Sequence, residues 1–545
     1  MQSSARRIAL LGFLVTAWPG ETANAQNQAS WGKLIVTVPV EASIYINDHP
    51  TRSIGAERHY WSGKILPGNV YVYRVRAELQ RDGQLLEETK TIELQAGQTK
   101  RLAFDFPNPP EPEPPDSQRR QRVRRPIETS DAPVDDLDDE KVAMASPTLP
   151  VAPPFVETYL ANGRLAEGEE ELMTLLRKTP QDNELRFSLA TVQFLRAVEG
   201  LMQGFYRHGL KYDAAMTPFG RPSIPFLRLP VPHNPAPEPI SYDDARDIMQ
   251  TFIRDLWKAE SSLAAMNGTE VQLVLDFGQM RIDSNGDGVA AEDELLWKIF
   301  ARVNPQMRIS NTTKASLLIA FDRADAYWLR GYCHLLMAMA EVVLAHDGKE
   351  LFERSAFLFF PKPVSPHTFL MHNSRQSRDM QTFYMVDLVA TVHSVNLPVA
   401  EPERMAAALT HLEVVVDESR KTWKAIQAEK DNDREWIPGP NQTGAIPNMR
   451  VTQNIVHRWH QFLDELDGLL DGKKLVPFWR SGVEGQGINV RRVFTEPTRL
   501  DLVAWVQGSA ATPYLEPGEL TDRSVWQRLQ DAFGGQMMTF IVWFN

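Results

Sequence analysis

The sequence contains one cysteine, Cys333, among 545 residues, so no disulfide can form within the chain. A chain of this length can bury a core large enough to fold without such crosslinks. Cys333 lies in the apolar run YCHLLMAMA, where a small buried hydrophobic side chain is expected more often than a nucleophile.

Long apolar runs and excess positive charge are also scarce. The most apolar later segment, residues 329–345, is interrupted by Arg330, His334 and Glu341, which favours a buried helix over a membrane span. Lysine and arginine total 58 against 70 acidic residues, a formal net charge of −12. Because phosphate binding needs a basic face, this balance argues against nucleic acid as a partner.

The first residues have the pattern of a secretory signal peptide, predicted to span residues 1–25. Arg6 and Arg7 precede a short apolar run over residues 8–18, and Ala23 with Ala25 forms an A-x-A cleavage site. We therefore expect an exported protein, located in the periplasm or at the cell surface. The alternatives are an uncleaved anchor and a start codon placed elsewhere.

Residues 33–106 predict a small all-β domain. Five runs are rich in β-branched or aromatic residues, and turn-forming dipeptides separate them. Short strands at this spacing favour a small β-sandwich. The runs are KLIVTVP, ASIYIND, VYVYRVRAEL, LLEETKTIEL and TKRLAFDF.

The same region resembles a known family. The run VPVEASIYINDHPTRSIGAERHYWSGKILPGNVYVYRVRAEL, followed by DGQLLEETKTIELQAGQT, is similar to the small secreted β domain of planctomycete type, which is PEGA-like. The resemblance covers about 75 residues, from the V-P-x-x-A-x-x-Y-x-N start to the A-G-Q-T end. It implies export and an accessory role in adhesion or scaffolding, and it carries no catalytic residues.

Residues 107–154 predict a disordered linker. PNPPEPEPPD is rich in proline and acidic residues, RRQRVRR follows at 119–125, and DDLDDE at 135–140 has the opposite charge. The arginines could contact an anionic envelope polymer or a membrane surface. The preferred interpretation is a solvated linker whose opposite charges attract each other.

Residues 155–545 predict a large, mainly α-helical domain. Ser241 can cap a helix with apolar residues at helical spacing, and further helical patterns run over residues 315–345 and 405–426. Residues 161–190 resemble a degenerate tetratricopeptide unit, with Pro180 near the turn, but no regular repeat follows. The predicted fold is therefore multidomain, a small β-sandwich followed by a large helical domain.

The stretch DSNGDGVAAEDE, residues 283–294, has the ligand spacing of a calcium loop. Oxygen ligands are needed at positions 1, 3, 5, 7, 9 and 12, with glycine at position 6. Gly288 takes position 6, and Ala291 at position 9 leaves that ligand to a water molecule. The predicted ligands are Asp283, Asn285, Asp287, Val289 through its carbonyl, and Glu294.

This stretch resembles the EF-hand and dockerin calcium loops. Residues 271–280 are expected to form the incoming helix and residues 293–303 the outgoing helix. Ala290 departs from the EF-hand pattern, which has a branched apolar residue at position 8, and the sequence has no second loop. We expect a structural Ca²⁺ of modest affinity; the alternative is an Asx-rich turn without metal.

Histidines offer weaker candidates for chemistry. His457 and His460, with Asp464 one turn further on, could form a zinc site, although aromatic neighbours favour packing. His367 and His372 lie in a polar loop. The preferred hypothesis is an exported, calcium-binding, non-catalytic protein that binds another protein or an envelope polymer such as polysaccharide or peptidoglycan. The alternative is an exported hydrolase with its active site in a cleft near these histidines.

Overall fold

A computed structural model of the chain describes most of both predicted domains. The described residues are 31–47, 49–51, 53, 55–63, 71–81, 84–94, 98–104, 106, 154–211, 229–268, 271–303, 317–371, 380–432, 434–445, 451–480 and 483–532. Two compact units divide the chain, one comprising Pro19–Glu140 and the other Met1–Trp18 with Lys141–Asn545. The predicted signal peptide and residues 107–153 of the predicted linker lie outside the described residues.

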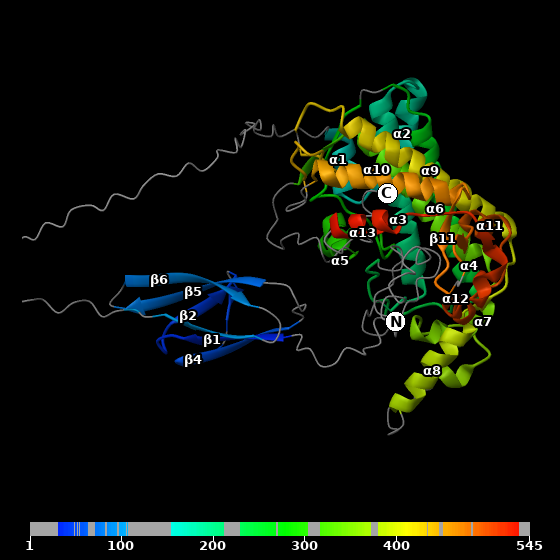
Figure 1. The fold of residues 1–545 in the computed structure, drawn as a ribbon. Coiled ribbons are helices and arrows are strands. Elements are labelled where there is room, and N and C mark those ends of the chain that lie inside the picture. The colour runs from blue at the N-terminus through cyan, green and yellow to red at the C-terminus, as the bar shows by residue number, and fades with distance from the viewer. Residues whose placement is uncertain are drawn as a thin grey trace, which may run out of the picture. The chain divides into compact units, whose positions relative to one another are not determined.

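The first unit is strand-rich and contains two sheets (Figure 1). One sheet has the order β4-β1-β7, with β1 antiparallel to β4 and parallel to β7. The other has the order β3-β2-β5-β6 and is antiparallel throughout. The strands are β1 (Trp31–Thr37), β2 (Ser43–Ile46), β3 (His49–Pro50), β4 (Glu57–Gly63), β5 (Tyr71–Arg81), β6 (Gln84–Leu94) and β7 (Thr99–Ala103).

One buried cluster takes side chains from both sheets of this unit. Val36 of β1, Ile44 of β2 and Val75 of β5 are each at most 1% exposed and belong to it. Alternate residues along β5 are buried, as a strand with one face on a core requires. The five strands that the sequence predicts are present.

The sequence prediction missed β3 and β4. The β4 sequence, ERHYWSG, begins with three polar residues, so its composition favours a loop. In the structure Arg58 is 4% exposed and its guanidinium donates to the carbonyls of Gly55, Val40 and Ala42. These bonds offset the cost of burying the charge and let a polar segment pair with β1.

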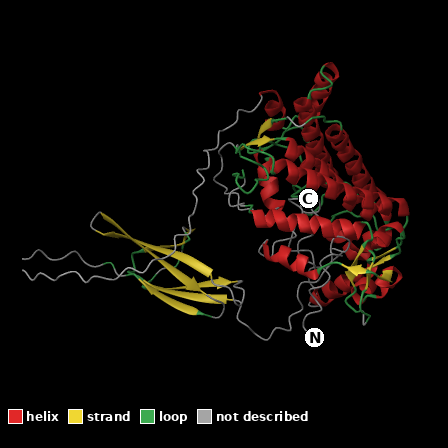
Figure 2. Cartoon of the chain, turned by 45° about the horizontal axis from the view of Figure 1, so that its top comes forward, coloured by secondary structure: helices red, strands yellow, loops and turns green. Residues whose placement is uncertain are grey.

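The second unit is mainly helical (Figure 2), as the sequence predicts. Short strands form a β8–β9 pair, a β10–β13 pair and a four-stranded sheet of order β14-β12-β11-β15. Its helices are α1 (Pro154–Ala161), α2 (Leu165–Lys178), α3 (Asn183–Arg207), α4 (Tyr242–Ala264), α5 (Leu296–Val303), α6 (Arg323–Ala345), α7 (Lys349–Ser355), α8 (Met380–Ser394), α9 (Pro402–Ile426), α10 (Gln453–Leu470), α11 (Val490–Thr495), α12 (Leu502–Gln507) and α13 (Arg523–Ala532). Its strands and 3₁₀ turns are β8 (Leu273–Asp276), β9 (Leu318–Phe321), β10 (Asn396–Leu397), β11 (Lys474–Pro477), β12 (Gln486–Ile488), β13 (Leu500–Asp501), β14 (Leu515–Pro517), β15 (Glu519–Leu520), η3 (Glu292–Glu294), η4 (Ala356–Leu358), η5 (Thr368–Met371) and η6 (Ser509–Tyr514).

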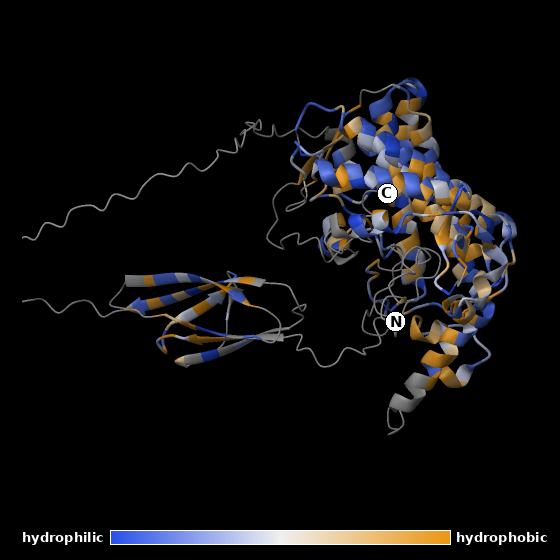
Figure 3. Cartoon of the chain, in the orientation of Figure 1, coloured by the Kyte–Doolittle hydropathy of each residue, from blue (hydrophilic) through white to orange (hydrophobic). Residues whose placement is uncertain are grey.

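The long helices pack side by side around one hydrophobic core. Helix α6 packs against α4 and α9, and α3 packs against α4. Cys333 lies in α6 at 0% exposure, and burial raises the pKa of its thiol, so the expectation of an inert buried cysteine is confirmed. No described helix is long and apolar enough to cross a bilayer. Helix α8 has a largely hydrophobic sequence (Figure 3), and Val386 and Val389 on it are more than half exposed.

The predicted start of α4 is confirmed, and two segments predicted to be helical are corrected. Ser241 caps α4 through a capping box with Asp244, and α2 and α3 form the predicted helix–turn–helix. Residues 315–345 are not one helix, because residues 318–321 form β9 before Asp322 caps α6. Residues 271–280 are not the predicted incoming helix. All four residues of β8 are buried and pair with β9, which suits a strand covered on both faces.

Candidate functional site

The loop at residues 283–294 follows β8 and is organised by the carboxylate of Asp283. Oδ1 of Asp283 accepts the Gly286 N–H at 2.7 Å, and Oδ2 accepts the Gly288 N–H at 2.9 Å. Gly288 has φ +83°, a conformation that disfavours residues with a side chain. The first ligand position therefore fixes the turn that the glycine at position 6 permits.

The next two predicted ligands repeat this pattern. Oδ1 of Asn285 accepts the Asp287 N–H at 2.8 Å, and Oδ1 of Asp287 accepts the Val289 N–H at 2.8 Å. Both are Asx turns, in which a side-chain oxygen holds the backbone two residues on. The Val289 side chain is 67% exposed, so this residue can serve the loop only through its main chain.

Glu294 is the buried anchor at the end of the loop, at 3% exposure. Oε1 of Glu294 accepts hydrogen bonds from the Ser284 N–H at 2.8 Å and from the Ser284 hydroxyl at 2.5 Å. Oε2 of Glu294 accepts one from the Ala291 N–H at 2.8 Å. The carboxylates of Asp283, Asp287 and Glu294 do not lie within 4.8 Å of one another. Binding an ion with both Glu294 oxygens therefore requires this carboxylate to leave Ser284 and turn inward.

Helix α3 supplies two contacts to the loop that the sequence did not reveal. The Asp283 N–H donates to Glu199 at 2.9 Å, and Gln203 donates to the Asp283 carbonyl at 2.6 Å. Burial raises the pKa of Glu199 to about 7, although the Asp283 N–H opposes this rise. Glu199 and Gln203 lie four residues apart on α3, but the helix carries other polar residues, so the sequence contains no clear signal for this pair.

The turn between α1 and α2 packs against the loop. The Arg281 N–H donates to the Leu160 carbonyl at 2.8 Å, and the Arg281 guanidinium donates to the Ala290 carbonyl at 3.0 Å. A Cβ added to Gly163 would lie 2.3 Å from the Ala290 Cβ. A side chain at residue 163 would therefore collide with Ala290, and glycine at this position lets the turn approach the loop.

Gly163→Ala should destabilise the helical unit by about 2 kcal/mol, because Gly163 has φ +65° and lacks room for a methyl group. Denaturant unfolding followed by circular dichroism at the helical wavelength measures this cost. Gly485→Ala is the matched control, since Gly485 has φ +74° but nothing within 4 Å of an added Cβ. Equal losses in the two variants would contradict a steric role for the Ala290 contact.

A separate acidic group lies after the end of α9. Glu429, Asp431 and Glu435 each have a carboxylate oxygen within 4.8 Å of the others, the one such group among the described residues. The Gln442 amide donates to Glu429 at 3.0 Å and Glu435 at 3.2 Å. Burial, followed by the charge of Asp322, raises the pKa of Glu429 to about 8. The group could hold a metal ion, and its residue types do not identify which.

A buried polar network joins α4, α6 and α9. Arg330 donates to Glu260 at 2.9 Å and to Glu418 at 2.7 Å, and both carboxylates are at most 5% exposed. His334 Nε2 lies 3.3 Å from Glu260 Oε1, and His334 Nδ1 lies 2.8 Å from His411 Nδ1. Burial would raise the pKa of Glu260, but hydrogen bonds from His334 and Arg330 outweigh it and lower the pKa.

This network is balanced in charge and fits a structural role. Lys421 donates to Glu418 at 2.8 Å, so Arg330 and Lys421 offset the two glutamates. Trp257 lies over both histidine rings, at 5.9 Å from His334 and 5.5 Å from His411. The guanidinium lies where a cation bridging the two carboxylates would have to sit, so the network specifies how three helices pack.

Among the described residues, no group of three possible metal-ligating side chains includes the histidines proposed for hydrolysis or zinc. His367 lies in the segment after η4, whereas His457 and His460 are on α10. Asp464, the third predicted zinc ligand, is paired with Arg420 at 3.0 Å. His372 lies outside the described residues.

Comparison with known proteins adds no family to this description. No known family model matches the chain, and neither a curated protein nor a solved structure matches it. The resemblances of the strand-rich unit and of the loop therefore stay predictions from the residues themselves.

Proposed function

We propose that this chain is an exported protein that acts by binding and that holds one structural Ca²⁺ in the loop at residues 283–294. The ligands are Asp283, Asn285, Asp287, the Val289 carbonyl and Glu294. The observation that carries the proposal is the double acceptor role of Asp283, which folds the loop around the turn at Gly288. A loop already folded in this way lowers the entropy that ion binding has to offset.

The ion would brace the helical unit rather than act in a reaction. The loop is bonded to α3 through Glu199 and Gln203 and to the α1–α2 turn through Arg281. A cation drawing Glu294 inward would tighten these contacts, because all of them meet within a few residues of the ligands. Extracellular calcium modules bind at roughly 10⁻⁴ to 10⁻³ M, so such a site would stay occupied outside the cell.

The strand-rich unit is proposed as a small β-sandwich with a scaffolding or adhesive role. Two sheets share one buried cluster, which supports the sandwich, and the resemblance to secreted β domains supports the role. The partner is proposed to be another exported protein or an envelope polymer, polysaccharide or peptidoglycan.

Calorimetric titration of calcium into the chelator-treated full chain tests the ion site. We expect one ion per chain and, at ten times Kd, a gain of about 1.4 kcal/mol in the free energy of unfolding. Asp287→Asn should weaken binding at least tenfold while keeping an acceptor for the Val289 N–H. Glu294→Ala should abolish binding and also destabilise the ion-free protein, because Ser284 and Ala291 lose their acceptor.

Two further variants make the result specific. Glu292→Gln changes an exposed carboxylate at a position that does not supply a ligand, and it should leave binding unchanged. Glu435→Gln alters the acidic group after α9, and a loss of calcium binding there would place the ion in that group instead. No binding at millimolar calcium would reduce the loop to a turn held by Asx side chains.

A further inference from the structure

Three asparagines in the chain are followed directly by glycine, at residues 162–163, 267–268 and 285–286. In such a pair the glycine nitrogen can attack the side-chain carbonyl carbon of the asparagine, because glycine has no Cβ in the way. A carbon–nitrogen bond forms in a five-membered succinimide ring, and the side-chain amide leaves as ammonia, which carries the proton lost by the glycine N–H. Water then opens the ring to aspartate or isoaspartate. The reaction requires the asparagine side chain to turn toward the glycine nitrogen.

The loop holds its asparagine–glycine pair by three hydrogen bonds. The Gly286 N–H donates to Asp283 Oδ1 at 2.7 Å, and a hydrogen bond to a carboxylate is stronger than one between neutral groups. Asn285 Oδ1 accepts the Asp287 N–H at 2.8 Å, and Asn285 Nδ2 donates to Asp287 Oδ2 at 3.0 Å. Ring closure would have to break these bonds, so the fold of the loop opposes the reaction at Asn285.

The pair at the end of α1 is held less firmly. Asn162 Nδ2 donates to the Thr158 carbonyl at 2.6 Å, which resists rotation of the asparagine side chain. The Gly163 N–H donates to the Leu160 carbonyl at 3.4 Å, longer than an ordinary amide hydrogen bond. One strong and one weak hydrogen bond therefore oppose the reaction at Asn162.

The third pair lies in the connection between α4 and β8, and the side chain of Asn267 is exposed. Asn267 Nδ2 donates to the Ala265 carbonyl at 3.3 Å, a long hydrogen bond that opposes rotation only weakly. In the described ranges of the chain the Gly268 N–H donates no hydrogen bond. The space beside Gly268 is open, since an added Cβ would meet one atom within 4 Å, Asn183 Nδ2 at 3.9 Å.

The main chain of Asn267 is joined to the start of α3. The Asn267 N–H donates to Asn183 Oδ1 at 3.2 Å, and Asn183 Nδ2 donates to the Asn267 carbonyl. These bonds act on the main chain and leave the Asn267 side chain free to rotate. Isoaspartate would turn the Asn267 carbonyl into a free carboxylate and lengthen the main chain between α4 and β8.

We propose that Asn267 is the position at which this protein deamidates, and that the folded loop protects Asn285 from the same reaction. The order of rates is Asn267, then Asn162, then Asn285. Isoaspartate at residue 285 would add a methylene carbon to the main chain inside the loop and displace the predicted ligands that follow. The protection comes from Asp283 and Asp287 themselves and does not depend on the proposed calcium ion.

Peptide mapping by mass spectrometry measures the three rates in the full chain, incubated in chelator at mildly alkaline pH. Water enriched in oxygen-18 labels each product, because the succinimide opens by hydrolysis. We expect Asn267 to react at least about tenfold faster than Asn285, with Asn162 between them. In urea the three rates should agree within about threefold, because the hydrogen bonds that distinguish the pairs are then lost.

Two variants test the protection directly. Asp283→Ala removes the acceptor of the Gly286 N–H and should raise the rate at Asn285 at least about tenfold, while the rate at Asn267 stays the same. Glu292→Ala removes an exposed carboxylate of the same loop and should change neither rate. Equal rates at Asn267 and Asn285 in the folded wild type would overturn the proposal, as would a fastest reaction at Asn162. An unchanged rate at Asn285 in Asp283→Ala would overturn the protective role of Asp283.

Discussion

Arg330→Met should lower the free energy of unfolding of the helical unit by about 3 to 5 kcal/mol. The substitution removes the guanidinium that donates to Glu260 and Glu418 and leaves two buried carboxylates short of a partner. Glu418 should contribute more to this loss than Glu260. It is 1% solvent-exposed, and its Oε2 accepts no hydrogen bond within the described part of the chain. Methionine fills a similar volume, so the loss is electrostatic rather than a cavity effect.

Denaturant unfolding followed by helical circular dichroism measures this cost in the unit that contains the helices. Arg420→Met is the matched control, because Arg420 also pairs with two carboxylates, Asp464 and Asp467, but on the surface. Surface pairs contribute at most about 1 kcal/mol. The interpretation as a buried network is wrong if the two substitutions cost the same. Adding Glu260→Gln and Glu418→Gln to Arg330→Met should recover part of the stability, since the unpaired charges are then gone.

Acid should destabilise the helical unit through His411. Burial, reinforced by the nearby His334, lowers the pKa of His411 to about 4, whereas an unfolded histidine titrates near 6.5. The unfolded state therefore binds a proton first as the pH falls. Stability from this group is complete above pH 6.5, declines as the pH drops toward 4, and amounts to about 3 kcal/mol in total.

The groups that face His411 come from two neighbouring helices. Among the described residues, α4 presents Trp257 and Glu260 to His411, and α6 presents His334. Protonation of His411 places a positive charge against the ring of His334, 2.8 Å away between the Nδ1 atoms. Among the described residues the His411 ring has no direct hydrogen bond to a carboxylate, so a charge on this ring is poorly compensated.

Unfolding free energies at pH 7 and pH 4.5 give the test. The wild type should lose about 2.5 kcal/mol more than His411→Gln over this interval, because glutamine cannot titrate. His457→Gln, which changes an exposed histidine on α10, should keep the wild-type slope. An unchanged slope in His411→Gln would show that other groups set the acid sensitivity.

The candidate loop could be found in the sequence because its chemistry is local. Twelve consecutive residues hold the oxygen ligands and Gly288, and the structure folds them by Asx turns that those residue types predict. The incoming element was wrong because a short apolar run does not distinguish a strand from a buried helix turn. Residues 273–276 form a strand because they pair with residues 318–321, and this distant partner is not visible in the local sequence.

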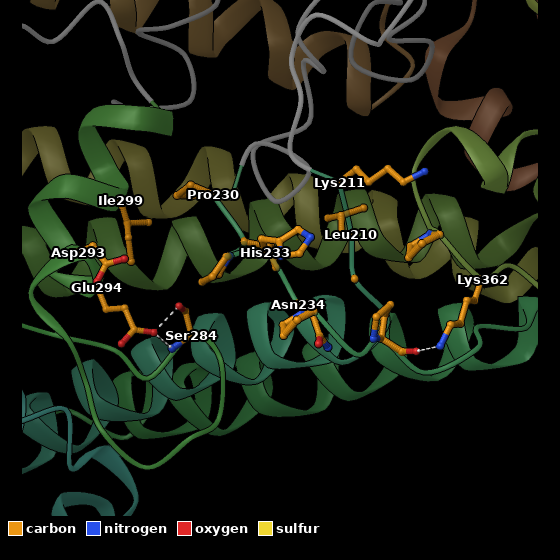
Figure 4. Close-up of a pocket in the computed structure, with 16 residues that line it drawn as sticks. Leu210, Lys211, Pro230, His233, Asn234, Ser284, Asp293, Glu294, Ile299 and Lys362 are labelled. Carbon is orange, nitrogen blue, oxygen red and sulfur yellow. Dashed lines mark hydrogen bonds between the residues drawn. The ribbon is translucent and has the colours of Figure 1, made fainter. Parts of the chain in front are cut away.

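The buried network and a cavity in the helical unit could not be predicted in the same way. Glu260, Arg330 and His411 lie on three helices and are separated by about 70 to 80 positions each, so no spacing rule connects them. Arg330 and His334 lie one turn apart in α6, which marks a polar stripe on an apolar helix but not its partners. The cavity, of about 730 Å³ and beside the loop (Figure 4), is lined by residues 209–211, 230–235 and 361–362, which are far apart in the sequence, so no local pattern predicts it.

The contact between Gly163 and Ala290 has a mechanical consequence. In sequence the strand-rich unit is tethered to the helical unit through residues that lead directly into α1. A force pulling on the connecting residues is thus applied to α1. The Leu160 carbonyl at the end of α1 accepts a hydrogen bond from the Arg281 N–H, just before the loop. Separating α1 from the helical unit would first have to break this hydrogen bond. An ion bound by the loop carboxylates would raise the force needed to separate α1 from the loop. The loop would then be the point at which the helical unit resists a pull from the strand-rich unit.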